Sequence, residues 1–144
     1  MKPHLELALP WPPKDLSPNA RKHWRGLAKA KAAYREKCRL ETLLQCHQSH
    51  VKLPNFMHLV MEFVPPDRRK RDRDNLIASM KAGIDGMADA LGINDARFTD
   101  LTVRIVETVT RAKGAASVQV KLYDAYRPPL LVRGADGLPS RMLL

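Results

Sequence analysis

The sequence has little of what several kinds of protein require. Its 144 residues include only two cysteines, Cys38 and Cys46, which lack the Cys-x-x-Cys spacing of zinc and redox motifs, so we expect a reduced, cytoplasmic protein without a disulfide framework. No apolar run reaches the length of a membrane-spanning helix, and Glu6 interrupts the short apolar stretch that would make a signal peptide. The motifs of P-loop nucleotide-binding proteins, serine hydrolases with a nucleophile elbow and His-Glu-x-x-His zinc proteases are also absent.

Acidic residues are few as well. Asp and Glu number 15 against 25 Lys and Arg, which gives a formal net charge of +10 and a pI of about 10.0. Such an excess favours a polyanionic partner. We find no helix with a basic face opposite a Trp/Phe/Leu face, so we expect nucleic acid rather than a membrane surface. With 44% apolar residues, the chain has the composition of one globular domain.

The hydrophobic patterns predict a small α+β domain. Alternating apolar residues indicate strands; a segment rich in Ala, Lys, Arg and Leu, which Asn19 could cap, indicates the first helix, and an apolar stripe with helical spacing indicates the second. The expected elements are strands over 4–9, 56–64, 102–110 and 116–123 and helices over 20–45 and 75–91. Lys113-Gly114 predicts an antiparallel hairpin between the last two strands. We therefore expect a single domain over 1–126, with a small mixed β-sheet of about four strands and two main helices, followed by an irregular tail over 127–144 that is rich in proline and glycine.

One segment combines strong positive charge with two acids. It contains five basic residues, which are Arg68, Arg69, Lys70, Arg71 and Arg73. They suit the phosphates of DNA, while Asp72 and Asp74, two residues apart, suit Mg²⁺ or Mn²⁺. If the segment is extended, the two carboxylates point to the same side, roughly 6.5–7 Å apart at the backbone. Asn75 would then cap the following helix. The alternative is that the acids only relieve the charge of the neighbouring arginines.

Three further polar residues extend this candidate site. On the predicted helix over 75–91, Lys81 and Asp85 lie on the same line as Asp74, beside the apolar stripe. Lys81 could contact a phosphate and Asp85 could hold its ammonium group, although a Lys–Asp pair four residues apart is more often a surface ion pair. Asp95 is a candidate third metal ligand, or else a turn residue.

The distance between Asp95 and Asp74 presents a geometrical difficulty. An unbroken helix over 75–91 is roughly 25 Å long and would keep Asp95 away from Asp74. The helix must break, with Gly83 as the expected weak point, or Asp95 acts elsewhere, which includes acting across a dimer.

The predicted helix over 20–45 forms a second basic surface because it carries many lysines and arginines. Two tryptophans, Trp11 and Trp24, flank its beginning in the sequence. We interpret both as packing residues rather than as platforms on which bases stack.

These motifs resemble the RusA family of Holliday junction resolvases, including its phage-borne members. The likeness rests on Leu9 to Pro13, on Ser17 to Arg21 with His23-Trp24, and above all on Pro66 to Leu76 followed by Lys81, Asp85 and Asn94-Asp95. It covers about residues 5–124. Two features depart from the family pattern: Lys81 comes three residues later after the acid pair, and Asn94 stands where many relatives carry an acid.

The resemblance implies a homodimeric, Mg²⁺-dependent endonuclease of bacterial or phage-infected cells, active in DNA recombination and repair. It would bind four-way DNA junctions and nick two opposing strands symmetrically. Asp72, Asp74 and Asp95 would be metal ligands and Lys81 the catalytic lysine. The main alternative is a non-catalytic, DNA-binding regulatory protein; an Asp-x-Asp phosphotransferase or glycosyltransferase for small molecules is less compatible with the basic charge.

Overall fold

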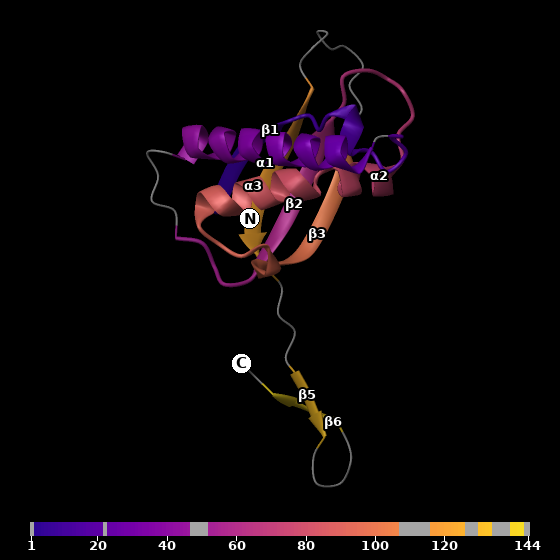
Figure 1. Ribbon diagram of the computed structural model, residues 1–144. Coiled ribbons are helices and arrows are strands. Elements are labelled where there is room, and N and C mark those ends of the chain that lie inside the picture. Colours follow the sequence, from indigo (N-terminus) through magenta and orange to yellow (C-terminus); the bar gives the residue numbers. More distant parts are fainter. Residues whose placement is uncertain are drawn as a thin grey trace.

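A computed structural model describes residues 2–21, 23–46, 52–106 and 116–125 with their side chains, and the backbone of 130–133 and 139–142. The elements follow one another along the chain as strands, short 3-10 turns and helices (Figure 1). They are β1 (Leu5–Pro10), η1 (Lys14–Leu16), α1 (Trp24–Cys46), β2 (Met57–Val64), α2 (Arg73–Ser79), α3 (Lys81–Leu91), η2 (Asp95–Arg97), β3 (Phe98–Ile105), β4 (Ser117–Asp124), β5 (Leu130–Arg133) and β6 (Pro139–Met142).

The main sheet is four-stranded and mixed, which confirms the expected α+β fold. Its order is β1-β4-β2-β3, where β4 runs antiparallel to both of its neighbours and β3 runs parallel to β2. The expected hairpin between the last two strands is therefore wrong. β4 lies between β1 and β2, and its alternate residues Val118, Val120 and Leu122 are almost fully buried, whereas β3 lies at the edge and keeps partly exposed side chains.

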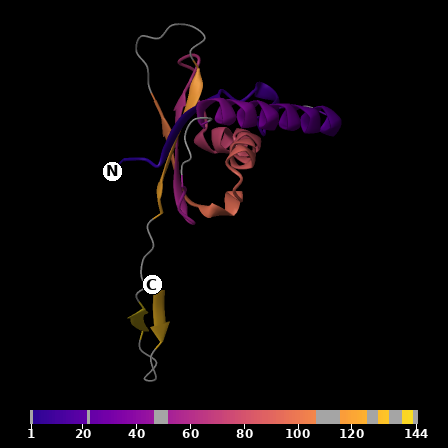
Figure 2. The ribbon, with the colours of Figure 1, turned by 90° about the vertical axis from the view of Figure 1, so that its left-hand side faces the viewer.

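The helices of the described part cover one face of this sheet (Figure 2). Strand residues that alternate along the sequence point to this side and form the core, together with side chains from α1 and α3. The strand residues of this core are Leu5, Leu7, Leu9, Met57, Leu59, Met61, Phe63, Val118, Val120 and Leu122. Their alternation is the pattern from which the strands were predicted.

The long helix α1 packs closely on α3. Tyr34, Cys38 and Thr42 recur at helical spacing on its buried side, and burial raises the pKa of the Cys38 thiol to about 11. Gly86 allows the closest approach, because a Cβ atom there would lie 2.1 Å from the carbonyl oxygen of Arg35. The Arg35 guanidinium also donates two hydrogen bonds, of 2.7 and 2.9 Å, to the Asp89 carboxylate. These contacts fix the axis of α3 and hence the position of its first residue, Lys81.

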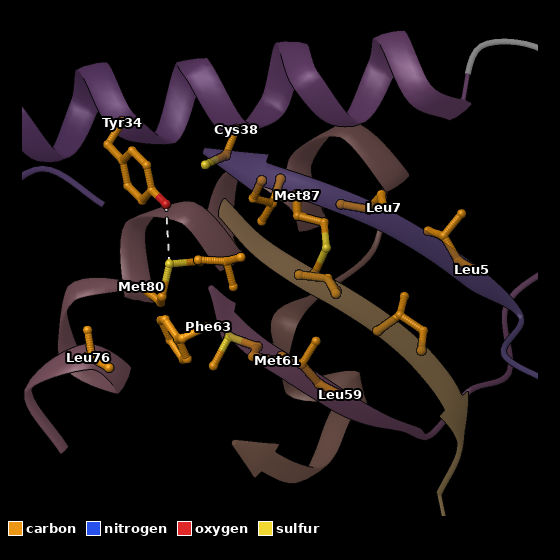
Figure 3. Close-up of a cluster of buried hydrophobic side chains, with 14 of the residues drawn as sticks. Leu5, Leu7, Tyr34, Cys38, Leu59, Met61, Phe63, Leu76, Met80 and Met87 are labelled. Carbon is orange, nitrogen blue, oxygen red and sulfur yellow. Dashed lines mark hydrogen bonds between the residues drawn. The ribbon is translucent and has the colours of Figure 1, made fainter. Parts of the chain in front are cut away.

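The helix predicted over 75–91 is broken. α2 ends and α3 begins at Met80, which has φ −88° and ψ −7°, one turn before the expected weak point at Gly83. Met80 is fully buried, and its sulfur lies 3.2 Å from the hydroxyl oxygen of Tyr34, whose shorter hydrogen bond, of 2.6 Å, goes to the carbonyl of Pro10 (Figure 3). Gly83 lies inside α3 instead, where its lack of a side chain makes room for the Tyr34 ring. The break therefore follows from tertiary contacts rather than from a helix-breaking residue.

Two short segments of the tail also form strands. The region over 127–144 was expected to be irregular, but β5 and β6 pair antiparallel in a two-stranded sheet of their own. Residues 107–110, predicted as the end of a strand, lie outside the described residues. None of the helices in the described ranges combines the length and the apolar character that crossing a membrane requires.

Candidate functional site

The basic loop before α2 is held by one aspartate. The Asp67 carboxylate accepts hydrogen bonds from the backbone N–H of Arg69 at 2.9 Å and from the Arg71 guanidinium at 2.8 Å. These two donors, the backbone N–H first, hold the pKa of Asp67 below its usual range. The Arg71 guanidinium also lies 5.4 Å from the centre of the Trp11 ring, and its side chain is only 18% exposed. Arg71, expected to contact DNA, thus has a structural role in this loop.

The other four cations of the segment face solvent. Arg68, Arg69, Lys70 and Arg73 are all exposed. The Arg69 guanidinium lies 3.7 Å from Asp67, a distance that leaves its side chain 78% exposed. The loop therefore presents several cations to a partner while Asp67 and Arg71 hold its backbone.

The two acids of the motif stand at the first turn of α2. Asp72 is the residue before the helix, and its carboxylate accepts a hydrogen bond of 2.8 Å from the backbone N–H of Asp74. Asp74 already lies in the helix, so the segment is not extended through both acids. The expected cap at Asn75 is wrong, because Asp72 is the N-cap residue of α2. Both side chains are exposed, and neither forms an ion pair with any residue in the described ranges. The acids do not pair with the neighbouring arginines in this conformation.

Lys81 connects the start of α3 to the turn after it. Its ammonium group lies 3.1 Å from the Asp85 carboxylate, as predicted, and 2.5 Å from the Asp95 carboxylate. The hydrogen bonds to Asp95 and then to Asp85 raise the pKa of Lys81, and the same lysine lowers the pKa of Asp95. Asp95 begins η2, which Asn94 caps by accepting a hydrogen bond from the N–H of Ala96. The ion pair to Asp95 was not predicted, because it depends on how the turn folds back along α3.

The donor set can be compared with the needs of Mg²⁺. This ion is commonly bound through one or two carboxylates, with waters and substrate phosphate completing its shell. Asp72 and Asp74 offer exposed carboxylate oxygens two residues apart at the start of α2, where the Asp72 carboxylate accepts from the backbone N–H of Asp74, and so they fit such a site. In the part of the chain that the structure describes, three or more His, Cys, Asp or Glu side chains nowhere come together as a metal site. The structure brings Asp95 to Lys81, and its role as a ligand stays a prediction.

The two tryptophans have different environments in the structure. Trp11 packs edge-on against Phe63, with ring centres 5.8 Å apart, as expected for a packing residue. Trp24 is 66% exposed at the first residue of α1, so the packing interpretation is wrong for this residue. Its ring lies 5.6 Å from that of His23 and 5.1 Å from the Arg25 guanidinium. The only sequence signal for this exposure is the polar character of both neighbours of Trp24.

The start of α1 and the acid pair lie at the same end of the domain. η1 packs against α1, and the Ser79 hydroxyl of α2, which donates a hydrogen bond of 2.8 Å to the carbonyl of Asn75, lies 3.4 Å from the carbonyl oxygen of Leu16 in η1. In Figure 1 the start of α1 and α2 lie toward the same side of the domain. Trp24 therefore presents an exposed aromatic ring on the side of the domain that carries the acid pair.

Fold and site together define a small α+β protein with an exposed aspartate pair inside a strongly basic surface. Models of known protein families give no match to the sequence. A protein of Xylella fastidiosa (strain Temecula1), described as uncharacterized, is 38% identical over 117 residues, which cover 79% of this chain and 74% of that protein. The chain belongs to the same family as this Xylella protein.

Proposed function

We propose that this protein is a metal-dependent endodeoxyribonuclease that acts on branched DNA, with four-way Holliday junctions as its substrate. The observation that carries the proposal is the state of Asp72 and Asp74. They are exposed in the most basic segment of the chain, yet neither pairs with an arginine among the described residues. Acids left unpaired among cations suit a divalent metal that approaches together with a phosphate.

Each residue of the site has a role in this proposal. Asp72 and Asp74 would hold Mg²⁺ or Mn²⁺, with Asp95 as a further ligand only if it leaves Lys81. When bound, the metal would supply Lewis-acid activation of the scissile phosphate and of water. Lys81 would stabilise negative charge that develops on the phosphate or on the leaving oxygen. Asp85 and Asp95 keep the Lys81 ammonium in place and protonated, because both favour its charged form.

DNA binding would rest on the exposed cations and on Trp24. Arg68, Arg69, Lys70 and Arg73 would contact phosphates, which position the DNA without reading its sequence. Trp24 would stack on a base that is unpaired near the branch point, since exposed aromatic rings serve this purpose in proteins that bind single strands. The likeness to the RusA family supports the same choice of substrate, and branched DNA explains why both features lie at one end of the domain.

The experiment is a nicking assay on a synthetic four-way junction with Mg²⁺, with binding measured separately in its absence. For Asp74→Asn we expect cleavage to be lost and binding to persist, because the variant removes a ligand charge and also reduces repulsion of DNA. A matched control is Glu6→Gln, which removes one negative charge from the sheet face without helices and should cleave like the wild type. Full cleavage by Asp74→Asn would refute the assignment of the site. Tight junction binding by a wild type that never cleaves would favour the regulatory DNA-binding alternative.

A further inference from the structure

The two edges of the sheet differ in how they are covered. At β1, the side-chain amide of Gln45 from α1 takes the place of a neighbouring strand. The Ala8 N–H donates to the Gln45 Oε1 at 2.8 Å, and the Gln45 Nε2 donates to the Ala8 carbonyl at 2.7 Å. At β3, in contrast, no described strand lies beyond the edge. An uncovered edge presents main-chain donors and acceptors to any strand that fits.

The backbone of β3 shows which of its residues face the open edge. The N–H of Val106, just after the strand, donates to the carbonyl of Phe63 in β2 at 2.8 Å. Since direction alternates along a strand, Leu101, Val103 and Ile105 turn their N–H and C=O groups away from β2. The register shift near Thr99 limits this regular stretch to residues 100–105.

The side chains of residues 100–105 are complementary to those of the same stretch in a second, antiparallel copy. We propose that β3 pairs antiparallel with β3 of a second copy of this chain, with Thr102 on the two-fold axis. Asp100 of each copy then lies opposite Arg104 of the other, and Leu101 lies opposite Val103. Leu101 is 48% exposed, and this pairing would cover it. Leu101 and Val103 would form a hydrogen-bonded pair and Asp100 and Arg104 a closer, non-hydrogen-bonded pair, which agrees with the direction of their backbone groups.

The charged side chains of β3 have no ion-pair partner among the residues that the structure describes. Arg104 lies beside Glu62 of β2, but the Glu62 carboxylate is taken up by the Lys121 ammonium at 3.0 Å. Asp100 lies beside His58, whose ring is bonded to the Thr102 hydroxyl at 2.6 Å. Neither Asp100 nor Arg104 forms an ion pair with another residue of the described ranges. An axis at Val103 would place Arg104 opposite Thr102 instead, so the charges select the axis at Thr102.

This dimer has a consequence for the candidate site. A two-fold axis between antiparallel neighbours stands perpendicular to the sheet, so the helices of both copies lie on the same face. α2 contacts β3, which brings the two acid pairs to either side of the axis on that face. This consequence rests on the proposed function, in which two matched nicks require two related sites; the interface itself does not.

The test measures the oligomeric state of the purified full chain without DNA, by sedimentation equilibrium over a range of concentrations. We expect a dimer for the wild type. Asp100→Arg and Arg104→Asp should each weaken it by roughly tenfold or more, because each puts like charges opposite each other in two symmetry-related pairs. A mixture of these two variants should form a heterodimer, and the double variant Asp100→Arg/Arg104→Asp should regain the wild-type affinity. A cooperative thermal transition for each variant shows that folding is retained.

A further variant tests the main-chain hydrogen bonds of the proposed interface. Val103→Pro removes an N–H that faces the edge and leaves the bonds to β2 intact, so it should abolish the dimer and keep the thermal transition cooperative. The interface would be overturned by a wild type that is monomeric, or by single variants that dimerise as tightly as the wild type. It would also be overturned by a double variant that dimerises no more tightly than the single variants. A monomer that nicks junctions would overturn only the interface, whereas a dimer that never nicks them would overturn only the nuclease.

Discussion

The contact between α1 and α3 gives a sharp prediction about the substitution Gly86→Ala. In an open helix this change is stabilising by about 1 kcal/mol, because alanine has the higher helix propensity. Here the new Cβ would lie 2.1 Å from the carbonyl oxygen of Arg35, 2.9 Å from its carbonyl carbon and 3.1 Å from the nitrogen of Arg39. All three are backbone atoms, so no side chain can turn away. The two helices would have to move apart, and overpacking of a core typically costs about 1–3 kcal/mol.

Because backbone atoms cannot turn away, we expect a cost near the upper end of this range, and hence a net loss of about 2 kcal/mol in the free energy of unfolding. Urea denaturation should show a midpoint lower by about 1 M, at the slopes usual for small proteins. Gly92→Ala is the matched control: Gly92 has φ +66° with no atom near a new Cβ, so only backbone strain of about 1 kcal/mol is expected. A wild-type or higher midpoint for Gly86→Ala would refute the close approach of the helices, and with it the placement of Lys81.

Three further predictions concern the site. Arg71→Ala should lower the urea midpoint, since the contact with the Trp11 ring alone is worth roughly 0.5–1 kcal/mol; an unchanged midpoint would contradict its structural role. Trp24→Ala should leave stability within about 0.5 kcal/mol but weaken junction binding by about 1–3 kcal/mol in a fluorescence titration, and unaltered binding would exclude stacking. In an NMR titration, Lys81→Met should raise the pKa of Asp95 back toward its usual range. Because the pKa of Asp95 is lower in the folded protein, the stability that this ion pair contributes is present above the unfolded pKa, near 4, and is lost as the pH falls through the folded pKa. An Asp95 pKa that is the same in the variant and the wild type would show that the ion pair does not form in solution.

The elements of the domain were predictable from local patterns. β1, β2 and β4 bury every second residue, and the same alternation is legible in the sequence. α1 was predicted from its composition and from Asn19 as a possible cap, although it begins at Trp24 rather than at Ala20, so Asn19 does not cap it. The neighbours of each strand were not predictable in this way. Lys113-Gly114 suggested a hairpin, but a turn signal reports only that the chain changes direction and not which strand it pairs with next.

The candidate site also has features that local sequence predicted and features that it did not. The motif itself placed Asp72, Asp74 and the cations in one segment, and the spacing of four residues placed Asp85 beside Lys81. Contacts between distant residues decided the rest: Arg71 turns inward to Trp11, Trp24 faces solvent, and Asp95 reaches Lys81. No local pattern carries such contacts, because each depends on where another element packs.

Residues close together in the chain were enough to predict the charge of this protein, the type of most of its elements and the residues of its basic and acidic motif. The order of the strands, the break at Met80 and the partners of Lys81 depend on residues far apart in the chain. β4 is paired along both of its edges, and Met80 interrupts its helix where its side chain meets the Tyr34 hydroxyl; contacts of this kind form only when distant elements pack together.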